Sequence, residues 1–280
     1  MIDLHSHILP GIDDGASSLE VSLDMARMAV ADGVHTMACT PHIYPGLYLN
    51  DAQGISRARQ QLQAALDVYR IALTLVDGAD VHLVPGLLEG LRAGRVPTLH
   101  GSRYVLLEPS HHVRPPRFEE SVFELVAAGY TPVITHPERL TWIEDHHDVF
   151  PRLVRQGAWM QVTAGALTGL FGKRALYWGE RMLGEGHVHL LASDAHSSGR
   201  RAPGLSQARA VAERLVGAEE ARRLVLDRPQ AILDDRPPSQ VPPPPQVCCP
   251  VHAPQTAVRG RPQASVPVAL PQFRPLRAQN

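Results

Sequence analysis

The chain has 280 residues, a formal net charge of -1 at pH 7 and 15 histidines. Its length allows one large α/β domain or two small ones. The near-zero charge provides no general attraction to nucleic acid or to an anionic membrane. The sequence also lacks an apolar run of about 18 residues and the start of a secretory signal peptide. We therefore expect a cytoplasmic protein that binds no nucleic acid and is not inserted in a membrane.

Residues 1–235 alternate short apolar runs with longer segments of helical periodicity. One such segment, 19–33, ends at Gly33, as the C-terminus of a helix often does. This alternation predicts a parallel sheet, either open and doubly wound or closed as a barrel. The seven predicted strands are Ile2–Leu4, Thr36–Cys39, Leu73–Val76, Tyr104–Leu107, Pro132–Ile134, Trp159–Val162 and Val188–Ala192.

Two further observations favour the barrel. The glycine-rich phosphate loops GxGxxG and GxxxxGK[ST] are both absent, which argues against a nucleotide-binding doubly wound fold. In addition, residues of the types that bind metal ions follow six of the seven predicted strands. In a parallel barrel these strand ends meet on one face. The residues are His5, His7, Asp13, Asp14, His42, Asp80, Glu108, His136, Asp194 and His196.

Histidine and carboxylate without cysteine is a ligand set that suits Mn, Fe or Zn. Leaving out Asp13, which the sequence leaves undecided between metal and turn, nine candidate ligands remain, too many for one ion. They predict two to three ions in one site. His5 and His7 are two residues apart, so at an extended strand end both side chains point the same way and can share an ion.

Each residue taken alone also has a structural explanation. A single histidine after an apolar strand, such as His136, is more often a hydrogen-bonded core or loop residue. Asp13 and Asp14 with Gly15 are typical of a turn, and Ser17 or Ser18 of a helix N-cap. The metal hypothesis depends on the coincidence across strand ends. The remaining histidine pairs receive no role: His111 and His112, His146 and His147, and His187 and His189.

From Arg236 onward the composition changes to a segment rich in proline and arginine without any acidic residue. Such density of proline favours extended polyproline II, so we predict a disordered tail over 236–280. It is a proline-rich ligand, an electrostatic tether or an extension without function, and we favour the last of these. Cys39, Cys248 and Cys249 cannot form a disulfide framework.

The motif HSHILPGIDDG, followed in order by CTPH, DGAD, LLEP, THPER and SDAH, resembles the polymerase and histidinol phosphatase (PHP) superfamily. Within it, residues 1–235 are most similar to the bacterial manganese-dependent tyrosine phosphatases of the CpsB/YwqE type, which are encoded with capsule and exopolysaccharide genes. The resemblance implies a distorted (β/α)7 barrel of the PHP type. It also implies a trinuclear Mn2+ centre.

Carried over residue by residue, the resemblance implies three groups of ligands. The first ion would be bound by His5, His7, Glu108 and Asp194; the second by Asp80 and His136, with Glu108 bridging; and the third by Asp14, His42 and His196. Relatives usually have glutamate where this chain has Asp80, which is one methylene shorter. Arg139 and Arg201 match arginines that surround the phosphate in the family.

The predicted chemistry is hydrolysis of a phosphomonoester by a metal-activated water. Arg139 and Arg201 would hold the phosphate oxygens, and His42 or His196 would assist proton transfer to the leaving group. The alternative phosphatase mechanism, a thiolate followed by five residues and an arginine, fits none of the three cysteines.

The main hypothesis is a phosphotyrosine-protein phosphatase that acts on the tyrosine-rich tail of a capsule-type bacterial kinase and so regulates polysaccharide synthesis. That substrate would place the enzyme at the inner face of the membrane. Two alternatives stay open. One is a phosphatase for histidinol phosphate or another small phosphomonoester, and the other is a non-catalytic PHP module that serves as a binding partner.

Overall fold

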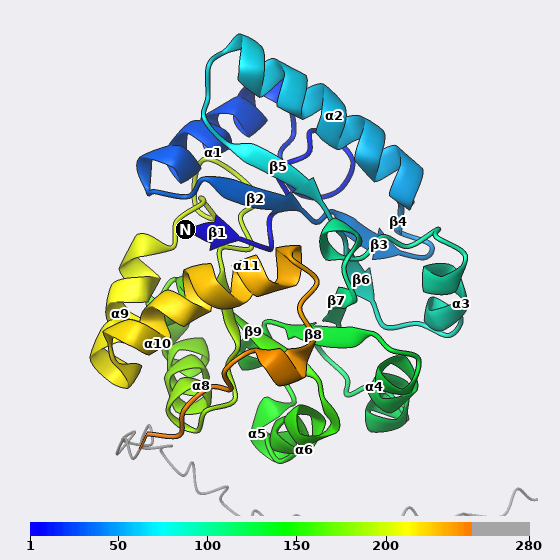
Figure 1. The fold of residues 1–280 in the computed structure, drawn as a ribbon, viewed down its shortest axis with the longest axis vertical. Coiled ribbons are helices and arrows are strands. Elements are labelled where there is room, and N and C mark those ends of the chain that lie inside the picture. The colour runs from blue at the N-terminus through cyan, green and yellow to red at the C-terminus, as the bar shows by residue number, and fades with distance from the viewer. Residues whose placement is uncertain (248–280) are drawn as a thin grey trace, which may run out of the picture.

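The structure is a computed structural model and describes residues 1–247. Parallel strands lie at the centre and helices surround them (Figure 1). The strands are β1 Ile2–Asp3, β2 Thr36–Cys39, β3 His42–Tyr44, β4 Tyr48–Leu49, β5 Thr74–Asp77, β6 Asp80–His82, β7 Tyr104–Glu108, β8 Thr131–Thr135, β9 Trp159–Thr163 and β10 Leu190–Ala192.

Helices connect most consecutive strands, and several follow the last one. The α-helices are α1 Leu19–Ala31, α2 Ala52–Val68, α3 Leu87–Arg92, α4 Phe118–Ala127, α5 Ile143–His146, α6 Val149–Gln156, α7 Ala164–Leu167, α8 Gly172–Gly184, α9 Ser206–Val216, α10 Ala218–Arg222 and α11 Arg228–Leu233. Four short helical turns complete the list: η1 Leu99–Gly101, η2 Pro137–Arg139, η3 Arg223–Asp227 and η4 Pro238–Gln240. Within residues 1–247, none of the helices combines the length and apolar character needed to cross a membrane.

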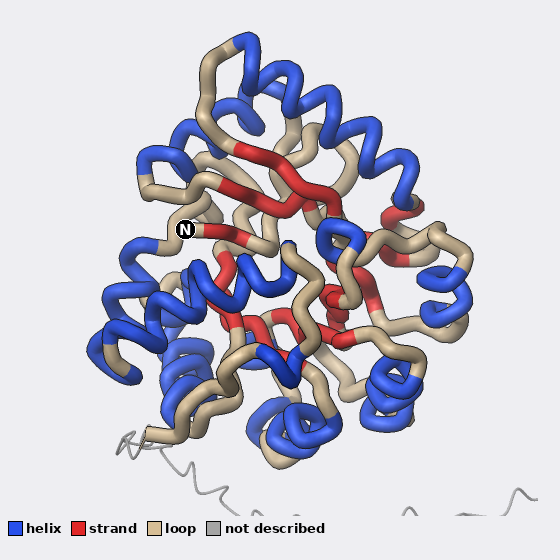
Figure 2. Tube along the Cα trace, in the orientation of Figure 1, coloured by secondary structure: helices blue, strands red, loops and turns tan. Residues whose placement is uncertain are grey.

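The strands form two sheets (Figure 2). The smaller has the order β1-β2-β5, and the larger has the order β10-β9-β8-β7-β6-β3-β4. Neighbouring strands are parallel except β3 and β4, which form an antiparallel hairpin at one edge of the larger sheet. The structure is therefore a mixed α/β fold built mainly on parallel sheets, as predicted.

The two sheets are joined by the segments that follow β1 of the smaller sheet and β10 of the larger sheet. Ser6, just beyond β1, pairs in parallel with Ala195, just beyond β10. The amide of His7 donates to the carbonyl of Ala195 over 2.8 Å, and the amide of Asp194 donates to the carbonyl of His5 over 2.9 Å. These bonds tie the start of the chain to a segment almost 190 residues later.

Two hydrophobic clusters hold the fold together. The larger lies between the strands and the surrounding helices; Phe118, Val122 and Leu125 bring one face of α4 into it at helical spacing. The smaller contains inward-facing residues of both sheets, and Ile232 of α11 covers one end of it. Successive side chains of β7 point alternately into the two clusters. Tyr104 and Leu106 belong to the smaller cluster, while Val105 and Leu107 belong to the larger one.

All seven predicted strand positions are strands, with ends that shift by one or two residues. Of the two predicted N-cap candidates, Ser17 and Ser18, the structure uses Ser18, whose hydroxyl accepts from the amide of Val21. The prediction missed β3, β4 and β6. The first two form a hairpin around Pro45 and Gly46, where Gly46 has φ of 87°. A Pro-Gly pair between short apolar runs is a turn signal, and it explains the antiparallel pairing.

The expectation of a disordered tail from Arg236 is wrong for its first part. Residues 236–247 lie against the fold: the Tyr104 hydroxyl donates to the carbonyl of Arg236 over 2.7 Å, and the amide of Val247 donates to the carbonyl of Gly184 over 3.0 Å. Prolines need no backbone donor partner, so an extended proline segment can pack wherever its carbonyls find donors. The rest of the predicted tail, with Cys248 and Cys249, lies outside the described residues.

Arg228 of α11 generates a prediction about stability. Its guanidinium is 1% exposed and makes a bidentate contact of 2.6 and 3.0 Å with the Glu220 carboxylate, which is 4% exposed. Arg228→Ala leaves the buried Glu220 carboxylate with only a longer ion pair of 3.6 Å to Arg223, so we expect a loss of about 3 kcal/mol in the free energy of unfolding, measured by urea denaturation. In the control, Arg222→Ala removes a 57%-exposed partner of Asp227 and should cost at most about 1 kcal/mol. Equal losses for both variants would contradict this account.

Candidate metal centre

The site begins with His5 and His7, directly after β1. Both side chains are fully buried, and their Nε2 atoms lie 3.3 Å apart. The Nδ1 atom of His5 lies 2.7 Å from Oε1 of Gln161, in β9. This contact fixes the orientation of the His5 ring and directs Nε2 into the centre. The alternation of an extended chain thus brings two imidazoles to one point, as the sequence predicts.

Asp13, which the sequence leaves undecided between metal and turn, contacts His7. Its Oδ2 accepts a hydrogen bond from His7 Nδ1 over 2.7 Å and another from the amide of His42 over 3.1 Å, while Oδ1 accepts from the amide of Gly15. Burial alone would raise the pKa of Asp13, but the hydrogen bond from His7 outweighs it and lowers the pKa to about 2. Asp13 therefore orients His7 from the side opposite the centre.

Gly15 allows this loop to close on His7. A Cβ atom at position 15 would lie 2.1 Å from the carbonyl oxygen of His7. The amide of Ala16 donates to that same carbonyl over 3.0 Å. Only glycine permits so close an approach, which gives the glycine of the DDG motif a steric reason.

In three more candidates the position differs: Asp80 is the first residue of β6, Glu108 is the last residue of β7, and His136 directly follows β8. Asp80 is fully buried, and its Oδ2 lies 3.5 Å from Nε2 of His5 and 3.9 Å from Nε2 of His136. Glu108 closes β7, with Oε1 3.4 Å from Nε2 of His136. Asp80 thus lies between the N-terminal pair and the Glu108 group.

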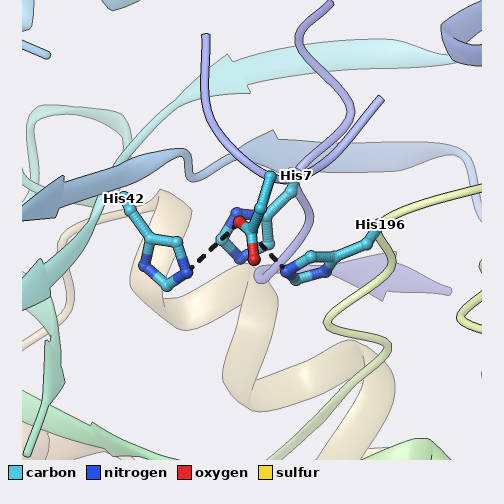
Figure 3. A group of neighbouring side chains, drawn as sticks. His7, His42 and His196 are labelled. Carbon is cyan, nitrogen blue, oxygen red and sulfur yellow. Dashed lines mark ion pairs between the residues drawn. The ribbon is translucent and has the colours of Figure 1, made fainter. Parts of the chain in front are cut away.

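Figure 3 shows the third group, in which the rings of His7, His42 and His196 surround a carboxylate. That carboxylate belongs to Asp14, whose Oδ1 is 3.6 Å from Nε2 of both His42 and His196. The His7 ring is 3.9 Å from that of His196 and 4.5 Å from that of His42, measured between centroids. The structure therefore brings together Asp14, His42 and His196, the predicted third set, and adds His7.

Asp194 connects the imidazoles to the two predicted arginines. Its Oδ1 lies 3.4 Å from Nε2 of both His5 and His7. Its Oδ2 accepts from Arg201 over 2.6 Å and also from Arg139. Burial acts to raise the pKa of Asp194, but the charges of His5 and the arginines and a hydrogen bond from His7 hold it well below its ordinary value.

Two of the candidate residues have a strained backbone. His136 has φ of 36° and Asp194 has φ of 51°, in the left-handed region that residues other than glycine rarely adopt. Both come directly or shortly after a buried strand and turn their side chains into the centre. Such strain persists only where the surroundings enforce it, and it concentrates at functional sites.

Sequence reasoning missed two histidines that lie at Glu108. Nδ1 of His82 is 3.5 Å from Oε2 of Glu108, and Nε2 of His111 is 3.5 Å from Oε1. His82 was overlooked because β6 was not predicted, although its spacing of two from Asp80 repeats that of His5 and His7. His111 was assigned no role because it follows its strand by three residues, in a loop that turns back over Glu108.

The other histidines without a predicted role lie apart from the centre. His189 is a core residue that stacks on Trp159, and its Nδ1 accepts from the amide of Met160. Burial lowers the pKa of His189 to about 3, so its ring is neutral. His147 and His187 meet at Glu185, away from the candidate centre. Cys39 is fully buried and forms no disulfide within residues 1–247, as expected of a small hydrophobic residue.

Comparisons with known proteins identify the family of this chain. Residues 1–234 match the family described as capsular polysaccharide synthesis, CpsB/CapC. The chain is 37% identical to the tyrosine-protein phosphatase YwqE of Bacillus subtilis over 221 residues, which is 78% of this chain and 86% of that protein. It is 31% identical to the tyrosine-protein phosphatase CpsB of Streptococcus pneumoniae over 245 residues, or 84% and 99% of the two chains.

A solved structure gives the same answer. The fold superposes with a TM-score of 0.81 and 32% identity on a structure from the work on YwqE of Bacillus subtilis and CpsB of Streptococcus pneumoniae, described as unique metal-dependent tyrosine phosphatases. The match covers 85% of this chain and 96% of that one. With its family match over almost the whole described fold and relatives above 30% identity, this chain belongs to the CpsB/CapC family.

Proposed function

We propose that this protein is a metal-dependent phosphatase that hydrolyses phosphotyrosine in proteins. The observation that carries the proposal is the meeting of histidines and carboxylates from six strand ends beside two arginines that share one carboxylate. The likeness to tyrosine phosphatases over most of the chain supports the same reaction.

We further propose that the two sheets act together as one distorted (β/α)7 barrel. The Ser6 to Ala195 pairing and the small hydrophobic cluster shared by both sheets support this arrangement. In such a barrel the carboxyl ends of the strands define one active-site face. Residues 1–235 would then be the catalytic domain, with 236–247 packed against it.

The donor set fits divalent metal ions. Oδ2 of Asp80 and Nδ1 of His42 are buried, lie 3.6 Å apart and have no hydrogen-bond partner within residues 1–247. Burial, followed by the charge of a neighbouring residue, lowers the pKa of His136 to about 4 and that of His196 to about 2. Both rings are therefore neutral, and neutral imidazole is the form that binds metal.

The proposed ligands are those that the resemblance implies: His5, His7, Asp14, His42, Asp80, Glu108, His136, Asp194 and His196. The short side chain of Asp80 reaches toward His5, His42 and His136, which supports its retention as a ligand in place of glutamate. Mn2+ is the proposed ion, because histidine and carboxylate ligands suit it; Fe or Zn share this preference. When bound, such ions supply a hydroxide nucleophile at neutral pH and neutralise phosphoryl charge.

The two arginines would bind the phosphate of the substrate. Arg139 is held from behind by the ring of Phe171, 4.4 Å from its guanidinium, and Arg201 is held by the carbonyl of Asp194. Both present N–H donors at the Asp194 carboxylate, a geometry suited to an anion with several oxygens. The low pKa of His196 argues against that residue as an acid, and phenolate is a good enough leaving group to need none.

The proposed substrate is a phosphotyrosine protein, namely the tyrosine-rich tail of a capsule-type kinase. The capsule family supports the biological setting. A groove of about 1160 Å³ runs along residues 112–124, which follow His111 directly, and it includes Val113, Phe123 and Trp142. This groove would accommodate the residues that flank a phosphotyrosine in a peptide.

The central experiment offers purified protein a phosphotyrosine peptide, a phosphoserine peptide and histidinol phosphate, each with Mn2+. We expect phosphate release from the first alone, and its loss when a chelator removes the ions. Preference for histidinol phosphate would favour the small-molecule alternative, and no release from any substrate would favour a binding module. Activity that survives thorough chelation would falsify the metal mechanism.

The role of Asp13 predicts a change in metal affinity. Asp13→Asn keeps the shape but weakens the hydrogen bond that orients His7, so half-maximal activation should need about 10–100 times more Mn2+. Titration of activity with Mn2+, together with calorimetry, measures this shift. Asp24→Asn, on the exposed face of α1, is the control and should leave the titration unchanged. An unchanged Mn2+ affinity in Asp13→Asn would remove Asp13 from the metal centre.

The role of Arg201 predicts a loss of catalytic efficiency. Arg201→Lys keeps the charge but removes the planar pair of donors, so kcat/KM for the phosphotyrosine peptide should fall by roughly 100-fold. Inhibition by inorganic phosphate should weaken in parallel. Arg200→Lys changes the exposed neighbour and should have little effect on either measurement. Equal behaviour of the two variants would show that Arg201 does not bind phosphate.

A further inference from the structure

A second group of potential ligands lies outside the candidate centre. His147 joins α5 to α6, Glu185 follows α8, and His187 is two residues further on. Oε2 of Glu185 lies 2.9 Å from Nε2 of His147 and 3.3 Å from Nδ1 of His187. Segments about 40 residues apart thus direct two imidazoles at one carboxylate oxygen.

The three atoms that meet there have no hydrogen-bond partner within the described residues, although each is buried. The short separations are therefore not those of well-directed hydrogen bonds. Ligands of a tetrahedral zinc ion with bonds of about 2.0–2.1 Å are about 3.3 Å apart, which is close to the separations seen here. All three atoms lie within 4.8 Å of one another, near enough to share one ion.

Neighbouring residues hold the group in place. Nε of Arg181 donates to Oε1 of Glu185 over 2.7 Å, which leaves Oε2 for the histidines. The Arg181 guanidinium lies 5.0 Å from the ring of Trp178, and the His147 ring stacks on that tryptophan with centroids 5.0 Å apart. Such outer contacts orient the ligands of metal sites.

The group lies close to the protein surface. The side chains of His147 and His187 are each 14% exposed, although the three atoms that meet at the group are themselves buried.

We propose that His147, Glu185 and His187 form a second metal site that binds a zinc-class divalent cation, with water as a further ligand. Two histidines and a glutamate with an open position form a known zinc ligand set. None of the three residues forms a hydrogen bond or ion pair with the candidate metal centre in the described part of the chain. The site joins the α5 to α6 connection to the end of α8, and it is independent of the proposed phosphatase reaction.

The test counts zinc in the full chain by elemental mass spectrometry and compares variants. We expect Glu185→Gln and His187→Asn each to bind one zinc fewer per chain than wild type. His146→Ala changes the adjacent histidine, which is outside the group, and should bind the wild-type number. All three variants should keep Mn2+-dependent phosphatase activity within about two-fold of wild type. Identical zinc counts in all four proteins would overturn the proposal.

Two additions make the result specific. Cys248 and Cys249 follow Val247 in the sequence and could bind zinc themselves, so the counts are repeated with both cysteines replaced by serine. The loss caused by Glu185→Gln should persist in that background; zinc that depends on the cysteines alone would overturn the proposal. Diffraction at the zinc absorption edge should show an anomalous peak among His147, Glu185 and His187, and a zinc-loaded crystal without that peak would also refute the site.

Discussion

The structure depends on how it compensates several carboxylates buried together. Asp80 is fully buried, Asp194 is 2% exposed and Glu108 is 7% exposed. An isolated carboxylate in such surroundings is costly enough that it would take up a proton. Arg139 and Arg201 compensate Asp194 directly, and imidazoles surround the other two. The proposed divalent ions would complete this balance, so the cluster that is costly to bury is also the one proposed to carry the chemistry.

The backbone accepts strain to build this cluster. Parallel strands bring their carboxyl ends together, but this alone does not direct the side chains that follow each strand into the centre. The left-handed conformations of His136 and Asp194, and the close passage of Gly15 over His7, correct the directions locally. These features have costs of the order of 1–3 kcal/mol each, which the packed strands beneath can bear. The strands thus provide the rigid support, and the strained residues that follow them set the directions of the side chains.

Much of the fold was predictable because its signals are local. Short apolar runs predict seven strands, and residues after them predict most members of the centre. The features that the sequence does not predict depend on contacts between residues far apart in the sequence or on very short elements. β6 has only three residues, which is too short for a periodic pattern, so neither the strand nor the position of His82 in it can be predicted. Asp13 could be placed only once the loop over His7 was known. The packing of residues 236–247 depends on donors such as the Tyr104 hydroxyl, which composition cannot reveal.

The candidate metal centre and the group at the end of α8 contain the same residue types, but their surroundings give them different roles. At the strand ends, histidines and carboxylates from several elements lie together beside arginines, which is why we propose that this cluster holds several ions and an anionic substrate. At the end of α8, one carboxylate oxygen of Glu185 meets two imidazoles, and Arg181 donates to the other oxygen. No free cationic group there is directed at a phosphate in the described residues. The second group therefore has the features of a structural ion site, which would join two helical segments without taking part in catalysis.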